Sequence, residues 1–181
     1  MNKFVCLALL LALAAATAPA QNFPGDVLAA GEWYTQGQTV ARVNPTTGKM
    51  TTLYASTATG HLQEIVMAED NSSFYVLSNA NDAIFKLDNL GNLITTIHSG
   101  PPLSIPDDMM LDQNGDLIVA DSAGLFKINV VTSQITTLLP TSTLAADGVT
   151  VDIDRGDLLI CGTGSMIHRY DIITGTTPPL T

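Results

Sequence analysis

The chain has 181 residues, of which 17 are acidic and 7 are Lys or Arg, so its formal net charge is −10. A surface this acidic repels nucleic acid and anionic lipid, which excludes both as partner classes and favours cations or neutral ligands. The length suits a single domain with a sizeable core.

The amino terminus predicts a secretory signal peptide over residues 1–20. Lys3 supplies a positive charge, a short uncharged apolar run follows, and Ala18-Pro19-Ala20 suits signal peptidase. The run is shorter than the ~20 apolar residues that span a bilayer. We therefore expect cleavage near Ala20 and a secreted protein, extracellular or periplasmic, with an uncleaved anchor as the alternative. No later segment is apolar enough to span a membrane.

The rest of the chain repeats one pattern: apolar, variable, basic, apolar, then Asn or Asp. The basic positions are Arg42, Lys86, Lys127 and Arg169. They recur every 42 residues or so, at about the period of a propeller repeat. A second marker keeps the same register at Leu53, Ile97, Leu138 and Leu180. We expect the basic residues to serve the repeat by pairing with neighbouring strands or blades.

Each repeat divides into short apolar strands separated by turn residues. In the third copy we expect strands at 109–112, 117–121, 125–129 and 134–139. The second copy predicts strands at 65–68, 74–78, 83–88 and 93–97, and the fourth at 149–153, 158–161, 166–171 and 176–180. Four antiparallel strands in such a length make one propeller blade. No segment has a helical apolar period, so helix is expected only in the signal peptide.

The sequence therefore predicts an all-β protein, a β-propeller of four-stranded antiparallel blades in a domain over residues 21–181. The expected blades are 25–54, 63–99, 106–140 and 147–181. The first copy opens at Gly25–Ala30, which aligns with the second strand of the later blades. We therefore expect part of a larger ring, for example a six-bladed one. A complete four-bladed ring or open arc is the alternative.

Two stretches, Pro106–Asp121 and Asp147–Asp152, resemble the repeats of NHL, streptogramin-lyase and SMP-30/gluconolactonase-like propellers. The resemblance covers nearly the whole mature chain. It implies a scaffold, because those families include calcium- or zinc-dependent lactonases, a magnesium-dependent lyase and non-catalytic binding domains. The lactonases hold metal at channel positions through Glu, Asn and Asp. Asp147 matches that pattern, whereas Asp107 stands where those enzymes carry Asn.

The residues just before the predicted innermost strands form the candidate site. They are Gln63-Glu64, Asp107-Asp108 and Asp147-Gly148, at equivalent positions of three repeats. Loops that lead into innermost strands converge on the central channel, and oxygen donors there suit a hard cation such as Ca²⁺. We name Glu64, Asp107, Asp108 and Asp147 as candidate metal ligands. The alternative is that these side chains only satisfy backbone groups of the loops.

Four further residues carry expectations. His61 is the weak candidate for an acid or base, because it lies just before Gln63. Trp33 and Tyr34 lie on an extended connection and either contact a ligand or cover the edge of the first blade. Cys161 is expected to be a buried, inert thiol rather than a reactive one.

The favoured function is a secreted scaffold that binds a protein, carbohydrate or small-molecule ligand, with Ca²⁺ the expected cofactor if there is one. The alternative is a metal-dependent hydrolase or lyase centred on the four candidate metal ligands.

Overall fold

The computed structural model describes residues 27–33, 37–56, 61–162 and 166–177. These residues form fourteen β-strands and no helix, which agrees with the missing helical period in this part of the sequence. Within the described ranges there is accordingly no helix able to cross a membrane. The predicted signal peptide lies outside the described residues.

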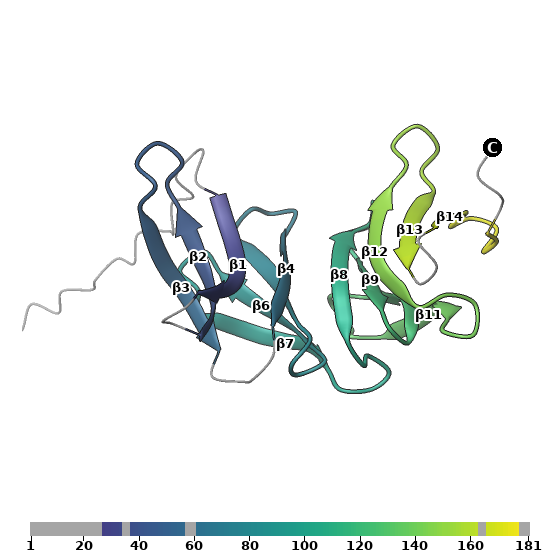
Figure 1. The fold of residues 1–181 in the computed structure, drawn as a ribbon, viewed down its shortest axis with the longest axis horizontal. Coiled ribbons are helices and arrows are strands. Elements are labelled where there is room, and N and C mark those ends of the chain that lie inside the picture. The colour runs from purple at the N-terminus through teal and green to yellow at the C-terminus, as the bar shows by residue number, and fades with distance from the viewer. Residues whose placement is uncertain (1–26, 34–36, 57–60, 163–165, 178–181) are drawn as a thin grey trace, which may run out of the picture.

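The strands form four antiparallel sheets, which we call blades 1 to 4 in chain order (Figure 1). Blade 1 is β1 (Val27–Trp33), β2 (Gly37–Val43) and β3 (Met50–Ser56); blade 2 is β4 (Leu62–Met67), β5 (Ser73–Ser78), β6 (Ala83–Asp88) and β7 (Leu93–Ser99); blade 3 is β8 (Pro106–Leu111), β9 (Leu117–Asp121), β10 (Gly124–Ile128) and β11 (Ile135–Pro140); blade 4 is β12 (Ala146–Val151), β13 (Leu158–Gly162) and β14 (Ile167–Tyr170). In every blade, each strand pairs with the next strand along the chain.

Burial falls from the second strand of each blade to its outer edge. Every residue of β5 and of β9 is buried, because both faces of these apolar strands are covered by other strands. The outer strand β7 is mostly exposed, half of the residues of the outer strand β11 are exposed, and both strands carry Thr-Thr pairs. Side-chain polarity thus sets which strand of a blade lies inside and which faces water.

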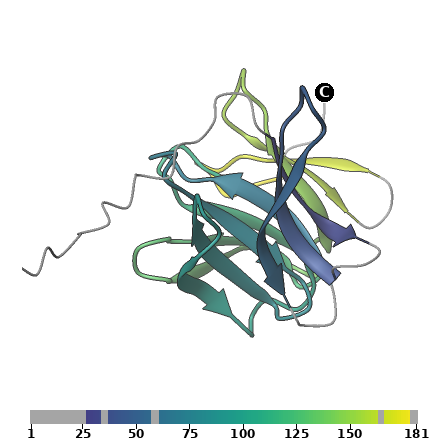
Figure 2. The same ribbon diagram turned by 90° about the vertical axis from the view of Figure 1, so that its left-hand side faces the viewer.

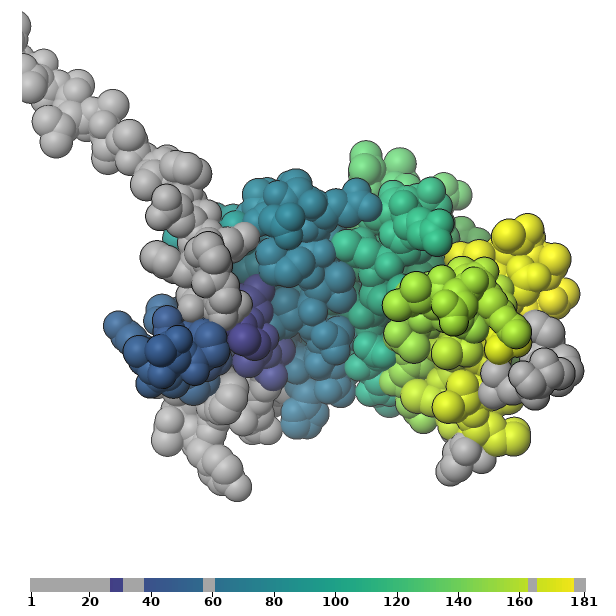
Figure 3. Space-filling view, turned by 90° about the horizontal axis from the view of Figure 1, so that it is seen from above, coloured from purple at the N-terminus to yellow at the C-terminus, as the bar shows by residue number. Residues whose placement is uncertain are grey.

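The three apolar cores lie between successive blades. The core between blades 1 and 2 includes Val40, Phe74, Val76 and Leu87. The core between blades 2 and 3 includes Leu77, Ile84, Leu117 and Val119. The core between blades 3 and 4 includes Ile118, Leu125, Leu158 and Ile160. The blades therefore stack face to face in chain order, as the colours of the space-filling view show (Figure 3). Figure 2 looks along this stack, with blade 1 toward the viewer. The predicted propeller requires this packing.

Blade 1 has three described strands, and its hairpin differs from the expected extended connection. Strand β1 continues to Trp33, which pairs with Gly37 at the start of β2. The prediction that Trp33 lies on a long loop is wrong, because Gly31 and Glu32 continue the ladder opposite Thr39 and Gln38. The connection is only residues 34–36, so Tyr34 lies outside the described residues.

Blade 4 also has three described strands. The outer strand expected at 176–180 is represented by one isolated bridge between Asp171 and Thr176. Residues 178–181 lie outside the described part of the chain. Strand β14 contains His168, as its place in the repeat predicted.

Candidate functional site

The three innermost strands β4, β8 and β12 carry a β-bulge at the same place. In each strand one residue has no partner across the ladder: Gln63, Asp107 and Asp147. A bulge sets two residues opposite one and re-aims their side chains. The sequence placed these residues in loops before the strands, which is wrong: they lie inside the strands, because the ladder continues on both sides of the bulge. We call the edge formed by Gln63, Glu64, Asp107, Asp108 and Asp147 the bulge edge.

Direct contacts join the bulge edge across blades. The Gln63 Nε2 donates to Asp107 Oδ1 at 3.4 Å, from blade 2 to blade 3. The Val149 backbone N–H donates to Asp108 Oδ2 at 2.8 Å, from blade 4 to blade 3. Strand β8 also contacts β4 and β12 directly. The four carboxylates proposed as metal ligands therefore share one edge of three neighbouring strands.

Two carboxyl groups of the bulge edge have raised pKa values. Burial raises the pKa of Glu64 and the charge of Asp108 adds to it, against the lowering effect of the Ile65 N–H. Burial also raises the pKa of Asp107, and the charges of Asp147, Asp121 and Asp108 raise it further. The charges that act on both groups are those of other carboxylates. The edge is therefore crowded with like charge.

The described residues do not bring three metal-ligating side chains to one point. Among them, no three His, Cys, Asp or Glu side chains lie close enough together to hold a metal ion. Two of the oxygens are already engaged by the backbone: Asp108 accepts from Val149, and Glu64 Oε1 accepts from the Ile65 N–H at 3.0 Å. The bulge edge thus supplies oxygen donors from three strands without a preformed metal cage.

Asp121 supports the bulge edge, although sequence reasoning missed it. Its side chain is fully buried at the end of β9, opposite Pro106. Its carboxylate accepts the backbone N–H groups of Ser104, Ile105 and Ala123 at 2.9, 3.3 and 2.6 Å. Burial still raises its pKa despite these bonds. Asp121 therefore fixes the segment that leads into β8, and the available signal was an Asp that ends an apolar run before a turn.

His61 and Cys161 lie near the bulge edge. The His61 N–H donates to Asn79 Oδ1 at 2.8 Å and its carbonyl accepts from the Asn79 N–H at 3.0 Å, which fixes the backbone before β4. The role of the His61 ring as an acid or base therefore stays a prediction. The prediction of a buried Cys161 is wrong, because the thiol is exposed. Its β12 partner is Gly148, which has no side chain to cover it.

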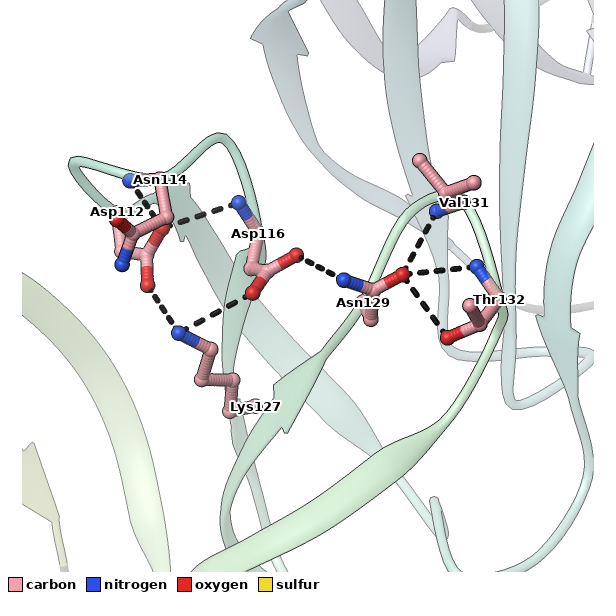
Figure 4. A network of polar contacts seen from close by, with 7 residues as sticks. All are labelled: Asp112, Asn114, Asp116, Lys127, Asn129, Val131 and Thr132. Carbon is pink, nitrogen blue, oxygen red and sulfur yellow. Dashed lines mark hydrogen bonds and ion pairs between the residues drawn. The ribbon is translucent and has the colours of Figure 1, made fainter.

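The repeated basic residues have structural roles, as predicted. The Lys127 Nζ lies 2.6 Å from Asp112 Oδ2 and 3.1 Å from Asp116 Oδ2, within a network that extends to Asn129 (Figure 4). Arg42 donates a hydrogen bond to the Asn89 carbonyl at 2.7 Å, and the Lys86 Nζ lies 5.4 Å from the centre of the Tyr75 ring. The Arg169 guanidinium forms ion pairs with Asp152 and Asp157, both at 3.7 Å. None of the four supplies a cation to the bulge edge in these contacts.

No protein-family model and no curated protein matches the chain. Solved structures do. The WD40 β-propeller domain of Doa1 aligns with 86% of this chain and 50% of its own at 14% identity and a TM-score of 0.63. A gluconolactonase from Xanthomonas campestris aligns with 69% of this chain and 41% of its own, at 20% identity and a TM-score of 0.54.

An auxiliary nutrient binding protein from Bacteroides thetaiotaomicron aligns with 84% of this chain at 16% identity and a TM-score of 0.64. The chain spans only 37% of that protein's length, and half or less of each of the other two. At such identities the likeness shows the fold and no reaction. Together with the stacked antiparallel sheets, it shows that this chain has the β-propeller fold, with about four blades.

Proposed function

We propose that the protein is a secreted β-propeller that binds a cationic or hydroxyl-rich ligand at the bulge edge and does not catalyse a reaction. Secretion is inferred from residues 1–20. The ligand is a divalent cation such as Ca²⁺, or a protein, carbohydrate or small molecule that presents positive charge or hydroxyl groups. The net charge of −10 argues against nucleic acid as a partner.

One observation supports this proposal above the others. Equivalent bulges on three separate strands carry these side chains; Gln63 donates to Asp107, and burial, followed by the charge of Asp147, raises the pKa of Asp107. Ionised carboxylates held together by the fold repel one another, and a bound cation or a set of hydroxyl donors would relieve that repulsion. Perturbed carboxyl groups at one edge of a scaffold are also typical of functional sites.

The test is thermal unfolding with Ca²⁺ against the same protein in chelator. A ligand that binds only the folded state increases the free energy of unfolding, by about 2.7 kcal/mol when its concentration is a hundred times Kd, and therefore raises the melting temperature. We expect Ca²⁺ to raise the melting temperature and Asp107→Asn with Asp147→Asn to remove the increase. Asp154→Asn is the matched control, because Asp154 is an exposed carboxylate at the opposite end of β12.

No shift with Ca²⁺ would contradict a cation as the ligand. Hydrolysis of a sugar lactone that disappears in the double variant would contradict a non-catalytic role and favour the hydrolase alternative.

A further inference from the structure

A cavity of about 440 Å³ lies between blades 3 and 4, at the end of β8 and β12 opposite the bulge edge. Its walls come from the β8–β9 turn, the β12–β13 turn and the turn after β14. The residues used below are Met110, Ile153, Arg155, Asp157, Ile172 and Ile173, all of which line it. Binding pockets for small ligands enclose about 300–1,000 Å³, so the volume suits a small molecule.

The equivalent seam between blades 2 and 3 is filled by apolar side chains. In that seam Val130 and Ile135 pack against the core between the blades. The repeat places Ile172 and Thr177 at the equivalent positions of blade 4, and both are exposed. Thr177 thus stands where blade 3 has Ile135, and among the residues that the structure describes none repeats the cover that Val130 and Ile135 give to that seam.

Two side chains of the apolar wall of the cavity are almost fully exposed. Ile153 is 89% and Ile173 is 91% exposed, although both are large aliphatic side chains. Ile172 and Met110, which are less exposed, line the same cavity. Water-exposed aliphatic surface around a concave site favours an apolar ligand, because binding removes that surface from water.

Among the described residues that line the cavity, all charged side chains but one have an ion-pair partner. Asp112 has Lys127 as its partner, and Asp157 has Arg169. Arg155 lines the cavity, and no described carboxylate lies within ion-pair distance of its guanidinium. A guanidinium is a planar donor that binds carboxylates with two parallel hydrogen bonds. The cavity thus combines an aliphatic wall with one available anion-binding group.

We propose that this cavity is a second ligand site, which binds a small amphiphilic carboxylate with an aliphatic chain. The chain packs on Ile153, Ile172 and Ile173, and the carboxylate accepts hydrogen bonds from Arg155. The site lies at the other end of the inner strands from the bulge edge, so it does not rest on the proposed function.

The test is a titration of the full chain with octanoate, followed through the isoleucine methyl resonances by NMR. We expect saturable shifts of the Ile153, Ile172 and Ile173 methyls. Arg155→Gln should weaken octanoate binding about tenfold, the loss expected when a charge-assisted hydrogen bond is removed. Ile153→Ser and Ile173→Ser should weaken it about as much, since each removes a contact of the aliphatic chain.

Two control variants match these changes. Val131 holds the position of Ile173 in blade 3 and is 87% exposed, but it does not line the cavity, so Val131→Ser should leave binding unchanged. Lys49→Gln removes an exposed positive charge far from the cavity and should also have no effect.

The proposal is overturned if millimolar octanoate gives no saturable shift, or if Val131→Ser weakens binding as much as Ile173→Ser. Octanol has the same chain without the charge. Equal binding of octanol and octanoate would overturn the assignment to a carboxylate.

Discussion

Strand β8 has a carboxylate near each end, and the pKa values of the two carboxyl groups are shifted in opposite directions. At the bulge edge, burial and then neighbouring carboxylates raise the pKa of Asp107. Just past the other end, burial also acts to raise the pKa of Asp112. There Lys127 and the N–H groups of Asn114 and Asp116 outweigh it and leave that pKa below its ordinary value. The two residues differ in their partners.

This difference separates a structural carboxylate from a candidate binding one. Asp112 accepts hydrogen bonds from Lys127, Asn114 and Asp116, so its ionised form stabilises the turn (Figure 4). Asp107 accepts a long bond from Gln63 and otherwise faces carboxylates. A charged group whose fold supplies no countercharge is where an external ligand gains most. The contrast also explains why the sequence motif around Asp112 is a turn and not a site.

The largest effect is expected from Asp112→Ala. The side chain is only 6% exposed and holds both the turn and Lys127. Removing it should cost about 2–4 kcal/mol of unfolding free energy, because the turn N–H groups and the lysine lose their acceptor. Urea unfolding followed by circular dichroism measures the change. Asp154→Asn is the control, and a loss for Asp112→Ala below about 0.5 kcal/mol, the range of ordinary surface substitutions, would break the comparison.

The carboxyl groups with lowered pKa values and those with raised pKa values should affect the pH dependence of stability in opposite directions. Asp112 and Asp88 have lowered pKa values, so their contribution is present above the ordinary aspartate value of 3.8 and is lost as pH falls below it. Asp107 and Glu64 have raised pKa values, so the folded state takes up their protons first and stability rises as pH falls from neutrality.

We therefore expect maximum stability on the acidic side of neutrality, with a steep loss below about pH 4 as the lowered groups titrate. Urea midpoints between pH 3 and pH 8 test this shape. Asp107→Asn should reduce the rise on the acidic side of neutrality. A midpoint that falls steadily from pH 8 downwards would contradict raised pKa values for Asp107 and Glu64.

The smallest effect is expected from Asp107→Asn at neutral pH. The amide keeps an oxygen that accepts from Gln63 and removes one of the repelling charges. Stability should rise, by less than about 1 kcal/mol, as is usual for relief of a partly exposed charge. The same urea measurement applies, and a clear loss of stability would mean that Asp107 is a structural residue like Asp112.

The repeat allows the fold to be predicted from the sequence, but it predicts only part of the candidate site. A period near 42 residues places residues at equivalent positions of successive blades, so the strands and the shared edge of Glu64, Asp107, Asp108 and Asp147 follow from it. The bulges do not, because they depend on the ladder register between two strands. The pairing of Trp33 with Gly37 was missed for the same reason.

The burial of individual side chains could also not be predicted from the sequence. Cys161 lies in an apolar run, yet it is exposed because its neighbour across the ladder is Gly148. Asp121 ends a predicted apolar strand, and the sequence does not show that three backbone N–H groups from flanking segments bond its buried carboxylate. Both cases depend on which residue faces which, and a repeat period does not specify that.

A carboxyl-detected NMR titration that compares Asp107 with Asp112 tests the central claim most directly. We predict that Asp107 titrates above the ordinary value of 3.8 and Asp112 below it, in the same sample without ligand. Equal pKa values, or an Asp107 that titrates below Asp112, would contradict the account of the bulge edge as an uncompensated, ligand-accepting surface.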